Sequence, residues 1–297
     1  MMNVKSFLLA IFSMSCSIAS YGQSNLLNAK TPGQIGIKSV AQRNSDNDKP
    51  LAYGYVHDRD ILMSKTTWEI IDLSEKINFP LYFPIDTANI GPDRRSLYDV
   101  LIKGIKKGKI TEVYSDSYFN TKKSFKDITA SLSRIDTTDA GREQLNAGSK
   151  ISPEYIVQQD ITSQDVTQYK IKGVWYFDKR QSEMKYRLLG ICPVTPDVYT
   201  MNTEEPDFIE LFWVFFPDAR ETLHRATAFN EKNSSMPITF DQILNSRRFN
   251  SIIYKEENVY GDREIKDYMK DNAQNQLLES DRVKDKIRSF EQDMWNY

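Results

Sequence analysis

The hydrophobic residues of the chain change from helical to strand-like spacing about halfway along it. In the first half, apolar residues recur at intervals close to 3.6, which predicts an amphipathic helix beginning near Asp58. Its apolar face is formed by Ile61, Leu62, Thr66, Ile70 and Leu73, with Trp68 beside it. Proline lacks an N–H and disfavours helical geometry in the residue before it. This helix is therefore expected to end in an aromatic turn between Pro80 and Pro84.

A second helix is predicted from about Arg94 to Lys107, followed by Gly108 as a residue suited to a left-handed C-terminal cap. Its apolar face is formed by Leu97, Val100, Leu101 and Ile105. The run from Ile110 to Phe119 is strand-like, and a short helix is expected to start at Phe125. The polar segment Thr137–Ser149 is expected to be a loop.

Alternating side chains predict a sheet in the second half. Tyr169–Phe177 places apolar residues on one face and lysines on the other, which is typical of a half-buried strand. The polar residues 178–183 then suit a hairpin connection to a partner strand, Met184–Cys192, closed by Pro193. Ile209–Phe216 is apolar on nearly both faces, which favours a central strand terminated by Pro217.

The remaining elements are shorter, except at the C-terminus. Helical spacing covers 218–228, a short helix at Phe240–Leu244 is capped by Thr239, and Phe249–Tyr254 is expected to return to the sheet. A charged helix is predicted from about Asp271. Its narrow apolar seam suits packing on one neighbour, either its own domain or a partner. The seam consists of Val283, Ile287, Phe290 and Met294.

Together these patterns predict an α+β fold, with mixed helices packed on a mainly antiparallel sheet, a flexible N-terminal arm and a C-terminal helix. Residues 1–22 have the short basic and apolar regions of a signal peptide. Cleavage before Cys16 with lipidation is an alternative to soluble export. The polar residues 23–57 are expected to be the flexible arm, which orders on a partner or serves as a spacer. Residues 58–265 would form the α+β domain and 266–297 the helix.

Composition narrows the classes of function. The chain has 39 basic and 41 acidic residues, a net charge of −2, which gives no reason to expect a nucleic acid partner. Beyond residues 1–22, no apolar run approaches the ~20 residues of a membrane helix. Cys192 is then the single thiol, so no internal disulfide is expected, and its apolar neighbours predict a buried side chain.

The sequence singles out no catalytic, cofactor-binding or metal-binding residue. Its two histidines, His57 and His224, have no metal-spaced neighbours. The stretch Gly104–Ile110 has the wrong glycine spacing for a phosphate loop and lacks the required Ser or Thr. Paired carboxylates for glycoside chemistry remain open, since their pairing is spatial.

Several long aromatic segments together resemble the family of the gliding motility protein GldN, also called PorN. The similar segments are Trp68–Pro84, Arg94–Leu101, Lys172–Asp178, Leu188–Pro193 with Pro196, and Trp213–Pro217. The resemblance extends from about Asp58 to Tyr260, whereas the arm and the terminal helix match only loosely.

This resemblance implies a periplasmic component of the type IX secretion system of Bacteroidota, associated with the outer membrane through a lipoprotein partner. In that family the protein forms a ring of many copies with the lipoprotein GldK or PorK. The motor proteins GldL and GldM lie beneath, and GldM reaches towards the ring. The family brings no catalytic residues or cofactors.

The leading hypothesis is therefore a non-enzymatic ring subunit of the secretion and gliding machinery. Tyr82 and Phe83, between the two prolines, are the candidate interface residues, because aromatic anchors suit protein contacts. A turn folded back into the core is the alternative for both side chains. The alternative functions are an exported hydrolase and a periplasmic small-ligand-binding protein.

Overall fold

The structure is a computed structural model that describes residues 48–86, 94–148, 150, 152–201, 203–204, 206–230, 238–270 and 272–295, with the single positions 31, 40 and 44. Residues 50–90 and 94–297 form one compact unit, to which all elements below belong. The predicted signal peptide, with Cys16, and most of the predicted arm lie outside the described residues. The last arm residues are described, and Tyr53 donates a hydrogen bond to Asn245 Oδ1 at 2.8 Å.

The predicted first helix is wrong, because this segment is the long strand β1, Ile61–Asp72. Residues of a strand that is covered on both faces do not alternate cleanly, so their apolar spacing can resemble that of a helix. Both Trp68 and Ile71 are buried, on opposite faces of β1. The segment is also rich in β-branched residues, which favour strands.

The main sheet is antiparallel and follows the order β11–β1–β5–β6–β8–β2, with β7 paired to β6. The bounds are β2 Val113–Tyr114, β5 Gln168–Asp178, β6 Glu183–Pro196, β7 Phe208–Glu210, β8 Trp213–Phe215 and β11 Ile252–Glu256. The predicted α+β class with a mainly antiparallel sheet is confirmed, as is the hairpin of β5 and β6.

Two further pairs of strands lie outside this sheet. One joins β3, Ser133–Thr137, to β4, Ile156–Asp160, and the other joins β9, Thr227–Ala228, to β10, Ile238–Thr239.

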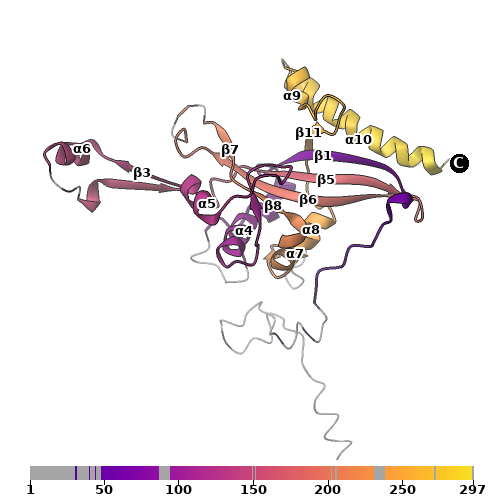
Figure 1. Ribbon diagram of the computed structural model, residues 1–297, viewed down its shortest axis with the longest axis horizontal. Helices are drawn as coiled ribbons and strands as arrows, with labels where there is room; N and C mark the ends of the chain where they lie inside the picture. The colour runs from indigo at the N-terminus through magenta and orange to yellow at the C-terminus, as the bar shows by residue number, and fades with distance from the viewer. Residues whose placement is uncertain are drawn as a thin grey trace, which may run out of the picture. The chain divides into compact units, whose positions relative to one another are not determined.

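Helices surround the main sheet. Their bounds are α3 Phe79–Tyr82, α4 Leu97–Lys106, α5 Phe125–Leu132, α6 Asp139–Asn146, α7 Phe216–His224, α8 Phe240–Asn245, α9 Ile265–Tyr268 and α10 Ala273–Trp295. Short 3-10 turns occupy η3 Asp58–Asp60, η4 Lys76–Asn78 and η5 Pro153–Tyr155. Figure 1 shows α10 beside β11 and β1, away from α4, α7 and α8.

Side-chain caps explain why several predicted helices form where they do. The hydroxyls of Ser96, Ser124 and Thr239 each accept a hydrogen bond from the backbone N–H three residues later, at the starts of α4, α5 and α8. Gly108 adopts a φ of 65° after α4, as its predicted capping role requires. These helices are confirmed with small changes of boundary.

Four other boundaries differ from the expectations. The strand predicted at Ile110–Phe119 is limited to β2, and Thr137–Ser149 contains α6 where a loop was expected. β6 continues through Pro193, because the carbonyl of Pro193 still accepts from Leu211 N–H at 3.1 Å. The single strand expected at Ile209–Phe216 is divided into β7 and β8.

Prolines begin helices here more often than they end them. Pro217 lies in the first turn of α7, and Pro80, which was expected to end a helix, lies in the first turn of α3. The first turn tolerates proline because its N–H groups have no intrahelical partner.

The main core lies between the sheet and the helices α4, α7 and α8. Its fully buried side chains include Ile71, Leu97, Leu101, Ile171, Phe216 and Phe240. A second cluster joins Trp68, Tyr114, Cys192 and Trp213, so Cys192 is buried as predicted. A third joins Ile253 of β11 to Val283 and Ile287 of α10. The seam of the C-terminal helix therefore packs on its own unit.

Candidate interface surfaces

The predicted interface pair Tyr82 and Phe83 follows a buried anchor. Leu81 is only 1% exposed and belongs to the main core. Tyr82 packs partly against that core, and its hydroxyl donates to the carbonyl of Gln164 at 3.0 Å. Phe83 is 40% exposed and begins a cis peptide bond to Pro84. The structure thus places Phe83 at the surface and Tyr82 half in the core.

The ring of Phe83 is held by its neighbours. Its centroid lies 4.8 Å from that of Tyr82 and 5.3 Å from that of Phe79, both edge to face. Phe79 is itself 36% exposed. Phe79 and Phe83 therefore form a small, pre-ordered aromatic surface at α3, which suits a protein contact because little side-chain entropy remains to be lost.

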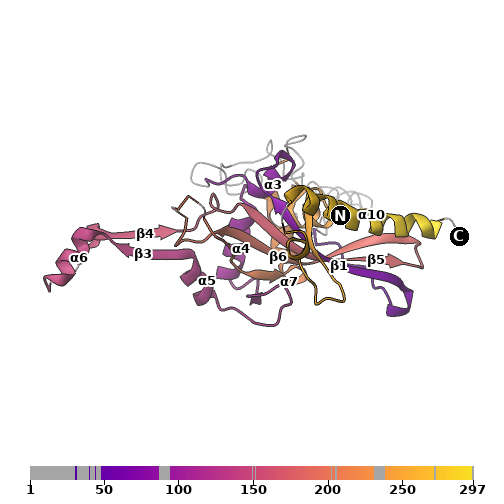
Figure 2. The same ribbon diagram turned by 90° about the horizontal axis from the view of Figure 1, so that it is seen from above.

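A second candidate surface was missed in the sequence. The ribbon, defined as Ser133–Asp160, consists of β3, α6 and β4 and extends away from the main sheet (Figures 1 and 2). Ile135, Leu145 and Ile156 on it are all exposed. Within it, the segment Thr137–Ser149 was expected to be a loop, because its residues are mostly polar and show no apolar period. The capping residue Thr138, which accepts from Gly141 N–H, was the available signal for α6.

The base of the ribbon contacts the segment between β6 and β7. The guanidinium of Arg134 lies 5.0 Å from the ring centroid of Tyr199, and Gln159 Nε2 lies 3.1 Å from Met201 Sδ. Tyr199 and Phe208 in this region are both exposed. Exposed aromatic side chains therefore lie beside the base of the ribbon.

A third surface lies at the C-terminal end of α10. Arg288, Glu291, Gln292 and Trp295 lie on one open face of α10. Trp295 is 71% exposed, and Glu291 accepts a hydrogen bond from Met184 N–H at 3.1 Å. Tryptophan and arginine side chains are enriched at protein contact sites, so Trp295 and Arg288 make this end of α10 a candidate surface.

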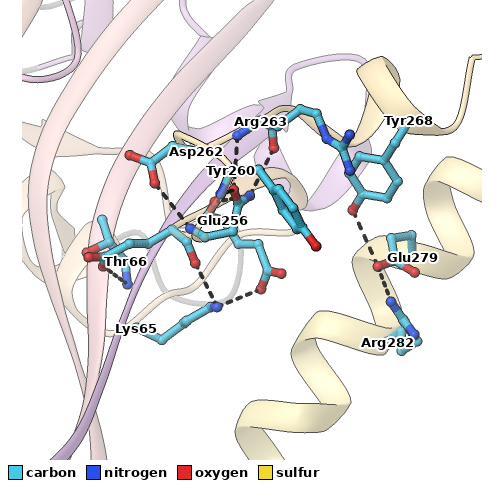
Figure 3. A network of polar contacts seen from close by, with 11 residues as sticks. Lys65, Thr66, Glu256, Tyr260, Asp262, Arg263, Tyr268, Glu279 and Arg282 are labelled. Carbon is cyan, nitrogen blue, oxygen red and sulfur yellow. Dashed lines mark hydrogen bonds and ion pairs between the residues drawn. The ribbon is translucent and has the colours of Figure 1, made fainter.

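A polar network holds α10 and the preceding loop in place (Figure 3). Lys65 of β1 contacts the Glu256 carboxylate at 3.1 Å, and Glu279 of α10 accepts from the Tyr268 hydroxyl at 3.3 Å. The guanidinium of Arg263 lies 4.7 Å from the Tyr268 ring centroid. Glu279 is also paired with Arg282 at 2.5 Å. Tyr268 thereby links α10 to α9, while Lys65 and Glu256 join β1 to β11.

Among the described residues, no group of three or more His, Cys, Asp or Glu side chains could hold a metal ion. His57 is exposed and His224 half-buried. Burial raises the pKa of the Cys192 thiol, which makes it a poor nucleophile. Within the same residues, no helix is long and apolar enough to cross a membrane.

The polar groups that lie over Trp68 of β1 are engaged with one another. The Lys172 and Lys255 ammonium groups lie 4.9 and 4.6 Å from the Trp68 ring centroid, and both also lie over Tyr118. Burial, and then the charge of Lys255, lowers the pKa of Lys172. Tyr118 in turn donates to Asp262 at 2.9 Å. These contacts fix the 115–120 loop on the sheet.

Comparison with known proteins agrees with the resemblance noted in the sequence. The family described as gliding motility associated protein GldN matches residues 56–296, which is most of the chain and extends into α10. The comparison with curated proteins gives no match. The chain belongs to the GldN family and is a component of the gliding motility and type IX secretion machinery.

Proposed function

We propose that this protein is a non-enzymatic, periplasmic ring subunit of the type IX secretion and gliding machinery. In this proposal it binds an outer-membrane lipoprotein of the GldK or PorK type and couples to the GldL and GldM motor. Family membership over residues 56–296 is the observation that carries the proposal. The exposed aromatic surfaces support it, because a subunit with several neighbours needs several separate contact sites.

A ring imposes a particular kind of contact. Each copy must present one surface to its neighbour on one side and a different surface on the other, and the lipoprotein needs a third. The chain offers surfaces at α3, at the ribbon and at the end of α10, and each carries exposed apolar side chains. We assign Phe83, with Tyr82 behind it, to the lipoprotein contact.

Co-purification tests the proposal. The chain expressed from Gln23 is mixed at micromolar concentration with the candidate lipoprotein, and the mixture is analysed by size-exclusion chromatography with light scattering. We expect a co-eluting assembly much larger than a one-to-one complex. A chain that stays monomeric and ignores the lipoprotein under these conditions contradicts the proposal.

Substitution of Phe83 tests the assigned contact. Phe83→Ala is expected to weaken lipoprotein binding at least about tenfold, because truncating a hot-spot side chain costs about 2 kcal/mol or more and a tenfold change corresponds to about 1.4 kcal/mol. Folding should be spared, since Phe83 is 40% exposed. Tyr82→Ala should lower thermal stability as well, because Tyr82 packs on the core. Tyr55→Ala, at an aromatic residue elsewhere that is 84% exposed, is the matched control. If all variants bind the lipoprotein equally well, Phe83 is not part of the contact.

A further inference from the structure

The predicted arm ends in a segment that is held on the folded unit. This segment, Leu51–Gly54, is named the strap, and it belongs to the compact unit that begins at Pro50. Leu51 is 85% exposed, and within the strap only Tyr53 is half-buried. Among the described residues, no backbone-to-backbone hydrogen bond joins the strap to the rest of the unit. The strap is therefore held through side chains.

Three side chains, Arg187 of β6, Arg220 of α7 and Asn245 of α8, form a clamp around Tyr53. The Tyr53 hydroxyl donates to Asn245 Oδ1 at 2.8 Å. The guanidinium carbons of Arg220 and Arg187 lie 4.1 and 4.7 Å from the Tyr53 ring centroid. Arg220 also donates to the first carbonyl group of the strap at 2.6 Å, and Arg187 donates to the last at 3.0 Å. Because each arginine contacts both the ring and the adjacent backbone, loss of the ring should release the whole strap.

The clamp does not need the strap to neutralise its buried charge. Arg220 forms a bidentate ion pair with Asp241, with N–O distances of 2.8 and 3.2 Å. The two residues are only 8% and 4% exposed. Asn245 Nδ2 donates to Asp241 Oδ1 at 2.8 Å, so these contacts lie entirely within α7 and α8. A buried charge is costly when its partner is lost, and here both partners remain when the strap leaves. The unit can therefore stay folded with the strap bound or released.

The residues after the strap leave it free to move. Tyr55 is 84% exposed, and its ring contacts that of His57, with centroids 6.1 Å apart. The backbone is next fixed to the unit at Asp60, whose carbonyl accepts from Lys179 N–H at 2.9 Å. Release of the strap would thus free at least residues 51–57, a stretch that spans up to about 23–25 Å when extended.

We propose that the strap is a latch between the N-terminal arm and the folded unit. In its closed state, the latch fixes the point at which the residues before Pro50 leave the unit. In its open state, it lengthens the free arm by residues 51–57 and thereby increases the distance at which a partner bound to the arm can lie. A segment with few buried contacts opens locally at much lower free energy than the core. The inference concerns the isolated chain and does not depend on the proposed ring function.

Spin labelling of the strap tests the proposal. A nitroxide is attached to Ala52→Cys, at an exposed strap residue, in the chain from Gln23, whose own Cys192 is buried. The electron paramagnetic resonance spectrum of this chain should be dominated by an immobilised component. Adding Tyr53→Ala should raise the ratio of mobile to immobilised label at least about tenfold, because the ring contacts of both arginines are lost. Adding Tyr55→Ala instead is the matched control and should leave the spectrum unchanged.

Two further readouts distinguish a latch from a contact that the fold requires. Tyr53→Phe keeps the ring between the arginines and removes only the bond to Asn245, so its spectrum should lie between those of the wild type and Tyr53→Ala. Thermal unfolding followed by tryptophan fluorescence should give Tyr53→Ala a melting temperature within about 2–4 °C of the wild type. The reason is that the Arg220–Asp241 pair is intact in this variant.

Three results would overturn the proposal. The label may be equally mobile with and without the Tyr53 ring, which means that the clamp does not hold the strap. It may instead stay immobilised in Tyr53→Ala, which means that other contacts hold it. A Tyr53→Ala chain that fails to fold, or that melts more than roughly 8 °C below the wild type, shows that the strap is part of the core. None of these results affects the ring function, which co-purification tests separately.

Discussion

Replacing Arg247 by alanine should destabilise the protein strongly, because Arg247 neutralises a fully buried carboxylate. Glu69 of β1 is 0% exposed. Arg247 Nη2 contacts Glu69 Oε2 at 2.6 Å, and Nη1 contacts Oε1 at 3.2 Å. The hydroxyls of Ser251 and Thr67 also donate to this carboxylate, at 2.5 and 3.2 Å. The carboxylate is thus surrounded by donors, and its only cationic partner in these contacts is Arg247.

The guanidinium is in turn held by aromatic rings. Its carbon lies 4.1 Å from the Tyr186 ring centroid, 4.9 Å from that of Trp175 and 5.3 Å from that of Phe249. Burial alone would lower the pKa of Arg247, but the charge of Glu69 raises it overall. Arg247 therefore stays charged throughout the pH range in which the protein folds.

The magnitude follows from the burial of Glu69. Removing one partner of a buried ion pair costs about 3–5 kcal/mol, because the remaining charge has lost its compensation. Lost stacking on the aromatic rings adds roughly 1 kcal/mol. Since a domain of this size loses about 2–4 °C per kcal/mol, a total loss of about 4–6 kcal/mol should lower the melting temperature by roughly 8–24 °C. Alanine keeps the Cβ, so the positive φ of 51° at this position is equally strained in both proteins.

Urea unfolding followed by tryptophan fluorescence measures the effect. Arg248→Ala, at the exposed neighbouring residue, is the matched control and should change the free energy of unfolding by less than about 0.5 kcal/mol. The double variant Glu69→Leu with Arg247→Met should be more stable than Arg247→Ala, because an apolar pair leaves no buried charge. A loss below about 1 kcal/mol in Arg247→Ala would refute the argument that this ion pair neutralises a buried charge.

Two further predictions concern the sheet. Gly173→Ala should lower the free energy of unfolding by about 1–3 kcal/mol or more, since a Cβ there would overlap the Tyr186 ring. The control Gly54→Ala meets no atom within 4 Å and should be neutral. Thermal unfolding compares the two variants, and equal stability would contradict the prediction. Because burial raises the pKa of the Cys192 thiol and the thiolate is the reactive form, a thiol reagent at pH 8 should modify the chain from Gln23 slowly when native and rapidly in urea. Rapid labelling of the native protein would show that Cys192 is accessible.

The candidate surfaces were only partly visible in the sequence. Phe83 could be singled out because two prolines bracket it, and it is exposed, whereas its neighbour Tyr82 is half in the core. The ribbon could not be recognised from its polar residues, since a surface that no part of the chain covers leaves no apolar period. Trp295 was not singled out either, as its exposure depends on where α10 ends relative to Met184.

The sequence by itself determined the elements whose signals are local. Ser96, Ser124 and Thr239 cap their helices through bonds that span three residues, and Gly108 supplies the positive φ after α4. The alternation of Tyr169–Phe177 likewise predicted β5 and its hairpin. Long aromatic segments were sufficient to indicate the GldN family.

Only the tertiary structure decided the state of β1 and the partners of its polar groups. The helical spacing from Ile61 to Leu73 gave way because β5 and β11 hydrogen-bond to this segment along both edges, while two core clusters bury Ile71 and Trp68 on its two faces. Glu69 finds Arg247 at a separation of 178 residues. Such a contact depends on how the whole chain packs, and no spacing within one segment encodes it. The strand state of β1 was hidden for a different reason, because burial on two faces removes the alternation that marks a strand.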